Sequence, residues 1–240
     1  MNLKILKSNF LYITFIGFFA FLINWMSGNL GVMPIDTFAF FDTGFSILKG
    51  KYPIRDFWIF QGLFVDYLQA LFFFILGSKW SSYVIHACCF NILISLVVYF
   101  TFINLNLSKF YSFLYALSVA TLCYPVSGTP FAYQHSFVLS LISIFLICLA
   151  IKKQSNILWF LLPITMVLAF LSQQTPSSYI NLVLIIIIFF YFFSKMNLNN
   201  FKFFISGSFF ILFCFAIFLV ISKTPLRDFV YQYILFPLTV

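Results

Sequence analysis

Aspartates supply all the acidic side chains of this chain, which contains no glutamate. Four of the five lie between residues 27 and 81. A carboxylate in a cavity with apolar walls and little water has a raised pKa, and such a group suits general base catalysis. The stretch 27–81 is therefore the first candidate for chemistry. The five are Asp36, Asp42, Asp56, Asp66 and Asp228.

The composition excludes a water-soluble fold. Of the 240 residues, 63% are hydrophobic, 23% are aromatic and 8% are charged, and the mean hydropathy is +1.08. An ordinary soluble domain is ~25% charged. The formal net charge of +8 comes from 13 basic residues against 5 acidic ones, and the basic residues are scattered singly or in pairs. Nucleic-acid binding needs a clustered basic face, so we expect membrane lipid as a partner and no nucleic acid.

Seven apolar runs predict an all-α, polytopic membrane protein with about seven transmembrane helices. Lys4 and Lys7 precede the first run, and no small-residue cleavage site follows it. We therefore interpret this run as a retained helix, not a signal peptide, with a cytoplasmic N-terminus. The expected location is the cytoplasmic (plasma) membrane, with several passes. The runs cover residues 10–26, 82–103, 110–124, 135–151, 157–171, 179–194 and 203–222.

A further apolar run, residues 62–77, decides the topology. If it stays in the outer surface layer, five more lysines lie on the cytoplasmic side, in agreement with the positive-inside rule. Asp66 and Gln69 also share one helical face of the run, which disfavours contact with lipid. We therefore expect a juxtamembrane or re-entrant helix within a long first extracytoplasmic loop, residues 27–81, and every aspartate outside. The five lysines are Lys109, Lys152, Lys153, Lys195 and Lys202.

Two other outer turns converge with this loop in the predicted topology, at residues 123–135 and 172–178. Both are polar and rich in Pro, Gly, Ser or Thr, a composition tolerated at the membrane edge where backbone lines a cavity. They predict an outward-facing pocket. The five cysteines lie in or beside apolar runs without C-x-x-C spacing, which is typical of small core residues and not of disulfides or a metal site.

The stretch MPIDTFAFFDTGFSILKGKYPIRDFWIFQGLFVDYLQALFFFILG resembles the first extracytoplasmic loop of GT-C glycosyltransferases. These integral membrane enzymes use polyprenyl-phosphate sugars and include relatives of protein mannosyltransferases and of the aminoarabinose transferase of lipid A. The matching elements are an Asp soon after the first helix, then G-x-Y-P-x-R-D-F, then Q-G-x₄-Y-L-x-A-L-x-F-x₃-G. Weaker similarity extends through residues 124–135 and 172–175. The resemblance implies one module over residues 1–240.

The resemblance implies a role for each polar residue of the loop. By position, Asp36 matches the catalytic base of the family, which deprotonates the acceptor hydroxyl. Asp56 would be a second carboxylate near the acceptor or a metal. Arg55, Lys51 and Gln61 would contact the donor phosphate, for which arginine offers the better geometry. If a divalent metal such as Mg²⁺ or Mn²⁺ takes part, its acidic ligands would be Asp36 and Asp56.

The implied reaction is sugar transfer with inversion, from a polyprenyl-phosphate donor to a hydroxyl acceptor on the extracytoplasmic face. His135 and Gln173 lie in the two other outer turns and are expected cavity contacts. Relatives often carry a lysine in place of Gln173, and some carry an acidic residue near His135. The chain ends at Val240, whereas relatives usually continue. Either the phosphate is held differently here, or the chain is an inactive or truncated relative.

Two other function classes stay open. A non-catalytic relative would bind lipid-linked sugar without turnover, and Gln173 favours it. A transporter or flippase would carry ionisable residues near the bilayer midplane, but the predicted spans are almost free of charge. Plainer interpretations also exist for single residues. Asp36 suits a helix N-cap, Arg55 and Asp56 suit a surface ion pair, and Asp66 suits a hydrogen-bonded structural carboxyl.

Overall fold

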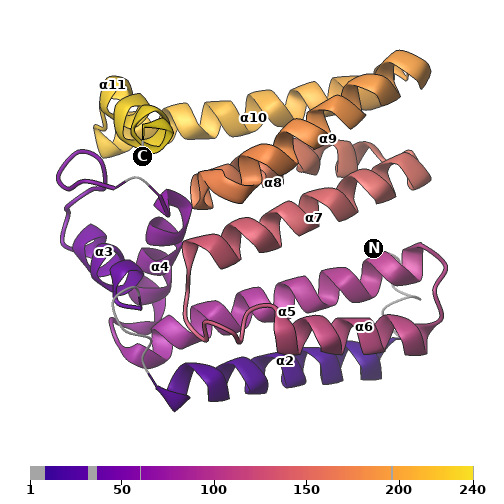
Figure 1. Cartoon of the computed structure of the whole chain (residues 1–240), viewed down its shortest axis with the longest axis horizontal. Coiled ribbons are helices and arrows are strands. Elements are labelled where there is room, and N and C mark those ends of the chain that lie inside the picture. Colours follow the sequence, from indigo (N-terminus) through magenta and orange to yellow (C-terminus); the bar gives the residue numbers. More distant parts are fainter. Residues whose placement is uncertain (1–8, 32–36, 60, 196, 240) are drawn as a thin grey trace. The chain divides into compact units, whose positions relative to one another are not determined.

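The computed structural model describes residues 9–31, 37–59, 61–195 and 197–239 (Figure 1). These residues form helices joined by turns and loops, and no β-strand occurs among them. This all-helical fold is the one predicted from the apolar runs. It follows from the solvent, because a helix satisfies its own backbone hydrogen bonds where water is absent.

Each of the seven predicted runs forms a helix. Five of the described helices, α2, α5, α7, α9 and α10, are long and apolar enough to cross a membrane, as expected for a multi-pass membrane protein. The other two, α6 and α8, have 14 and 17 residues, fewer than the ~20 of an untilted span. The count of seven spans therefore stays a prediction. The bounds are α2 (Phe10–Leu30), α5 (Trp80–Asn104), α6 (Lys109–Leu122), α7 (Ala132–Lys153), α8 (Asn156–Ser172), α9 (Gln174–Lys195) and α10 (Leu198–Ser222).

The run that decides the predicted topology forms α4 (Leu63–Leu76), a helix of 14 residues. Both polar residues of its predicted face are buried: Asp66 and Gln69 have exposed fractions of 1% and 0%. This face is thus covered by protein, as its carboxylate and amide require. The membrane side on which α4 lies stays a prediction.

The chain divides into two compact units, and the first contains α2, α5 and α6. Asn91 of α5 connects all three helices. Its Nδ2 donates to the carbonyl oxygen of Ala20 in α2 at 3.0 Å and to that of Ala120 in α6 at 2.9 Å. Hydrogen bonds between helices help to hold a bundle together where lipid weakens the hydrophobic drive for association.

The second unit covers the described residues of 38–75 and 131–240. Its helix α8 packs against α7, α9 and α10, with Trp159 and Leu162 fully buried in the core. Gly207 lets α10 approach α8 closely, because a Cβ on Gly207 would lie 2.1 Å from the Phe160 carbonyl oxygen. Small residues at such contacts are typical of membrane helix pairs.

The second unit also contains α3 (Ala39–Leu48), α4 and a C-terminal segment. This segment consists of α11 (Leu226–Phe229), one π-helical turn η1 (Val230–Leu235) and the 3₁₀ turn η2 (Phe236–Leu238). The Gln232 Oε1 accepts from the Ile59 N–H at 3.3 Å, and its Nε2 donates to the Ile54 carbonyl oxygen at 3.0 Å. The C-terminal segment therefore anchors the loop that holds the R-D-F motif.

Candidate functional site

The R-D-F motif forms a closed ion pair within its loop. Arg55 donates to Asp56 twice, from Nε to Oδ1 at 2.9 Å and from Nη2 to Oδ2 at 2.6 Å. The Tyr52 N–H donates to Asp56 Oδ2 at 2.7 Å, and the Tyr52 ring centroid lies 4.5 Å from the guanidinium carbon. Ile54 turns the chain here with a left-handed backbone, φ 71°. The loop thus holds the Asp56 carboxylate in direct contact with the Arg55 guanidinium.

Hydrogen bonding fixes the charges of this pair. The Arg55 hydrogen bonds, followed by the Tyr52 N–H, lower the pKa of Asp56 below its ordinary value. The same pairing raises the pKa of Arg55. Arg55 also donates from Nη1 to the Ser222 carbonyl oxygen at the end of α10, at 3.0 Å. Because the side chains are 28% and 31% exposed, a phosphate can approach, but it must share Arg55 with Asp56.

Lys51 and Gln61 flank this pair along the chain. Lys51 is exposed, and its charge contributes to the lowered pKa of Asp56. Gln61 is half-buried and precedes Gly62, whose N–H donates to the Ser172 carbonyl oxygen at 2.8 Å. That bond places the backbone of Gln61 near the end of α8, where Gln173 follows Ser172.

The two predicted cavity contacts meet at the same end of α8. The Ser136 hydroxyl, near the start of α7, donates to the Gln173 carbonyl oxygen at 3.1 Å. Its neighbour His135 is fully buried, with Nδ1 at 3.0 Å from the Phe131 carbonyl oxygen of its own helix start. Gln173 is half-buried. The start of α7 and the sequence after α8 thus come together, while contact of either side chain with a substrate stays a prediction.

The predicted base Asp36 lies outside the residues that the structure describes. The described residues contain no group of three or more His, Cys, Asp or Glu side chains that could hold a metal. Both carboxylate oxygens of Asp56 already accept hydrogen bonds. A divalent metal on Asp36 and Asp56 therefore stays a prediction that requires Asp56 to change partners.

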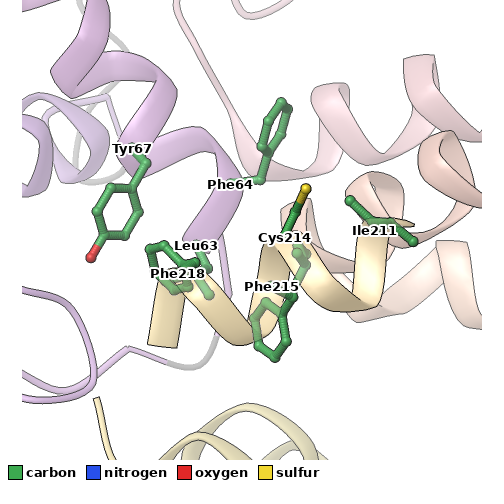
Figure 2. A pocket seen from close by; sticks show the side chains of 8 residues that line it. Leu63, Phe64, Tyr67, Ile211, Cys214, Phe215 and Phe218 are labelled. Atoms are coloured by element: carbon green, nitrogen blue, oxygen red, sulfur yellow. The ribbon is translucent and has the colours of Figure 1, made fainter. Parts of the chain in front are cut away.

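Two apolar grooves lead along α4 and α10 toward the ion pair. The first has a volume of about 210 Å³ and the second about 260 Å³, and Tyr67, Cys214 and Phe218 line both. Figure 2 shows the side chains of the first groove, with the Tyr67 hydroxyl on the side of the ring away from Cys214. The second groove reaches Tyr52 and Ser222, both of which contact Arg55. An apolar path thus ends beside a charged pair.

Tyr67 carries a polar group in this apolar path. Its ring packs edge-on against Phe218, with ring centroids 4.8 Å apart. Its hydroxyl is buried and has no hydrogen-bond partner among the described residues. A buried hydroxyl without a partner carries a free-energy cost, so this group is suited to bind a ligand that supplies an acceptor.

Asp66 is buried and hydrogen-bonded, as its structural interpretation predicts. The Thr43 hydroxyl of α3 donates to its Oδ1, while its Oδ2 is buried with no partner in the described part of the chain. Burial raises the pKa of Asp66 well above its ordinary value, and the Thr43 hydrogen bond opposes this shift only in part. Burial thus favours the neutral form of this carboxyl, and the Thr43 hydrogen bond links α3 to α4.

This charge state gives a pH prediction. Because the folded pKa of Asp66 lies above the unfolded value of ~3.9, its neutral form favours the folded state. This contribution is complete below pH ~3.9 and is lost as pH rises through the folded pKa. We expect Asp66→Asn to remove this fall in stability, measured as the free energy of unfolding in detergent across pH 4 to 9. Asp42→Asn, at an exposed position of α3, should keep the wild-type profile. Identical profiles for wild type and Asp66→Asn would contradict the neutral carboxyl.

Sequence reasoning gave no role to two features of this site. Tyr67 lies within the Q-G-x₄-Y-L element quoted above, so the tyrosine of that motif was the available signal. The C-terminal segment gave no such signal. Yet Tyr233 is fully buried, and its hydroxyl donates to the Leu171 carbonyl oxygen at 2.6 Å. Its role follows from packing and not from a local pattern.

No protein-family model, no curated protein and no solved structure matches this chain. The GT-C resemblance is therefore carried by the quoted motifs alone.

Proposed function

We propose that this chain is a membrane glycosyltransferase that moves a sugar from a polyprenyl-phosphate donor to a hydroxyl acceptor. The observation that carries the proposal is the apolar path along α4 and α10 that ends at Arg55 and Asp56. A donor of this class has the same two parts, a long apolar chain and an anionic phosphate. Cationic groups at the phosphate stabilise the charge that develops as it leaves.

In this proposal the lipid chain lies along the grooves and the phosphate lies at Lys51 and Arg55. The Tyr67 hydroxyl, which has no partner within the described residues, donates to a phosphate oxygen. Asp36 takes the proton of the acceptor hydroxyl as its oxygen attacks the anomeric carbon. The bond from that carbon to the phosphate oxygen breaks, and the polyprenyl phosphate leaves with the electron pair.

Tyr67→Phe tests the donor site. Loss of a hydrogen bond to a charged phosphate should raise the donor KM ~10-fold or more. The folded protein should keep or gain stability, because the hydroxyl has no partner in the described structure to lose. The measurement is transfer of labelled sugar from polyprenyl-phosphate donors in membranes, with thermal unfolding of the purified protein alongside.

Tyr233→Phe is the matched control. It removes a hydroxyl that bonds to the Leu171 carbonyl oxygen, so it should lower stability by ~1 kcal/mol and leave the donor KM unchanged. An unchanged donor KM in Tyr67→Phe, with wild-type transfer intact, would remove Tyr67 from the donor site. Absence of transfer by wild-type protein that expresses normally would contradict the proposed function.

A binding protein without turnover is the second candidate. The guanidinium of Arg55 is already paired with Asp56, and a neutral Gln173 stands where relatives often carry lysine. Both features weaken stabilisation of a leaving phosphate. Saturable binding of a polyprenyl-phosphate sugar with no transfer would identify this function in the same assay.

A further inference from the structure

A third apolar groove lies between α9 and α10, and we call it the α9–α10 groove. It shares no lining residue with the two grooves described above. Its volume is about 530 Å³. The residues from α9 follow the spacing i, i+3, i+4, i+7 and i+8, which places them on one helix face. The lining consists of Ile185, Ile188, Phe189, Phe192, Phe193, Phe201 and Phe204.

Aromatic packing shapes one end of this groove. Phe192 of α9 meets Phe201 and Phe204 of α10, with ring centroids 5.2 and 6.3 Å apart. Behind it, the ring of Trp159 in α8 lies 4.8 Å from that of Phe192. The groove is therefore lined by aromatic rings of α9 and α10, and Trp159 of α8 lies next to Phe192, which lines it.

Two lysines lie at this end. Lys195 is the last residue of α9, two positions after Phe193, and Lys202 follows Phe201 in α10. Both are exposed, and neither forms an ion pair with any residue that the structure describes. No Asp or Glu occurs in the sequence between residues 132 and 222. The charged side chains that lie next to these lining residues in the sequence are thus all cationic.

A network of amides holds the turn between the two helices. The Gln154 Oε1 accepts from Asn197 Nδ2 at 3.1 Å, from Asn200 Nδ2 at 2.9 Å and from the Tyr191 hydroxyl at 2.9 Å. The end of α7, the end of α9 and the start of α10 are thereby tied together. The helix ends that carry the two lysines are therefore held together by side-chain hydrogen bonds.

We propose that the α9–α10 groove is a binding site for one anionic phospholipid of the surrounding leaflet. One acyl chain occupies the groove, and the headgroup phosphate lies between Lys195 and Lys202. Basic pockets between membrane helices bind anionic headgroups in this manner, and lysine stems extend along apolar surface to reach them. A zwitterionic lipid can fill the groove but has no net charge to match the lysines. The proposal is independent of sugar transfer.

Trp159 provides the readout. The full chain with Trp25, Trp58 and Trp80 replaced by Phe keeps Trp159 as its only tryptophan. In phosphatidylcholine nanodiscs, brominated phosphatidylglycerol should quench Trp159 at a ~10-fold lower mole fraction than brominated phosphatidylcholine, as expected for two lysines at the headgroup. Lys195→Gln with Lys202→Gln should abolish this preference, and Lys195→Arg with Lys202→Arg should retain it.

The control removes two charges from the same end of the unit. Lys152→Gln with Lys153→Gln changes the exposed end of α7, which does not line the groove, so the preference should persist. Equal quenching by the two lipids, or equal loss in both glutamine pairs, would overturn the proposal. The proposal would also be overturned if neither lipid quenched Trp159 and the protein eluted as a dimer in size-exclusion chromatography, because a second copy of the chain would then cover the groove. Native mass spectrometry of the unsubstituted chain, which should retain one phosphatidylglycerol, checks the result without tryptophan variants.

Discussion

Asp36→Asn is expected to lower sugar transfer by ~10²–10⁴-fold, which is the usual contribution of a general base. Asparagine keeps the shape of the side chain but cannot take the proton of the acceptor hydroxyl. The fall should appear in kcat with little change in the donor KM, because the base acts on the acceptor and not on the donor phosphate. The measurement is transfer of labelled sugar in membranes with matched expression of each variant.

Asp42→Asn is the matched control for this prediction. Asp42 lies six residues further along, is exposed on α3, and should transfer at the wild-type rate as the asparagine variant. Full activity of Asp36→Asn would contradict its role as base. The residue at the N-cap of α3 is Phe38, so the N-cap interpretation of Asp36 does not hold for this helix.

Gly207→Ala is expected to have the largest effect on stability. The added Cβ would lie 2.1 Å from the oxygen and 2.9 Å from the carbon of the Phe160 carbonyl group, and 3.0 Å from Pro163 Cγ. Backbone atoms of α8 cannot rotate away as a flexible side chain can. The two helices must therefore separate, and overpacking of this kind typically costs ~1–3 kcal/mol or more. Unfolding of the purified protein in a denaturing detergent series measures the change.

Gly17→Ala is the control for helix propensity. Gly17 lies in α2, and its Cβ position has no neighbouring atom within 4 Å. Alanine there should be neutral or stabilise by up to ~1 kcal/mol. Similar behaviour of the two variants would show that the close approach of α10 to α8 does not limit stability.

Much of the helical layout was predictable from local sequence. Apolar runs of suitable length become helices because lipid and buried protein leave the backbone no other hydrogen-bond partners. The burial of Asp66 and Gln69 followed in the same way, from the spacing that places both on one helix face. The sequence alone therefore determined the all-helical class, the positions of the seven runs and the inward face of α4.

The partners of the polar side chains depended on tertiary structure. Arg55 bonds to Ser222, 167 positions away, and Gln232 bonds to Ile54, 178 positions away. No local sequence pattern encodes such pairs. The helices have similar apolar surfaces, so tertiary packing determines which helices become neighbours and which polar groups meet. The grooves have the same origin, since Tyr67 and Phe192 line theirs only through the placement of α10 beside α4 and α9. Hydropathy and periodicity thus determined which segments are helices, whereas packing decided which polar groups meet.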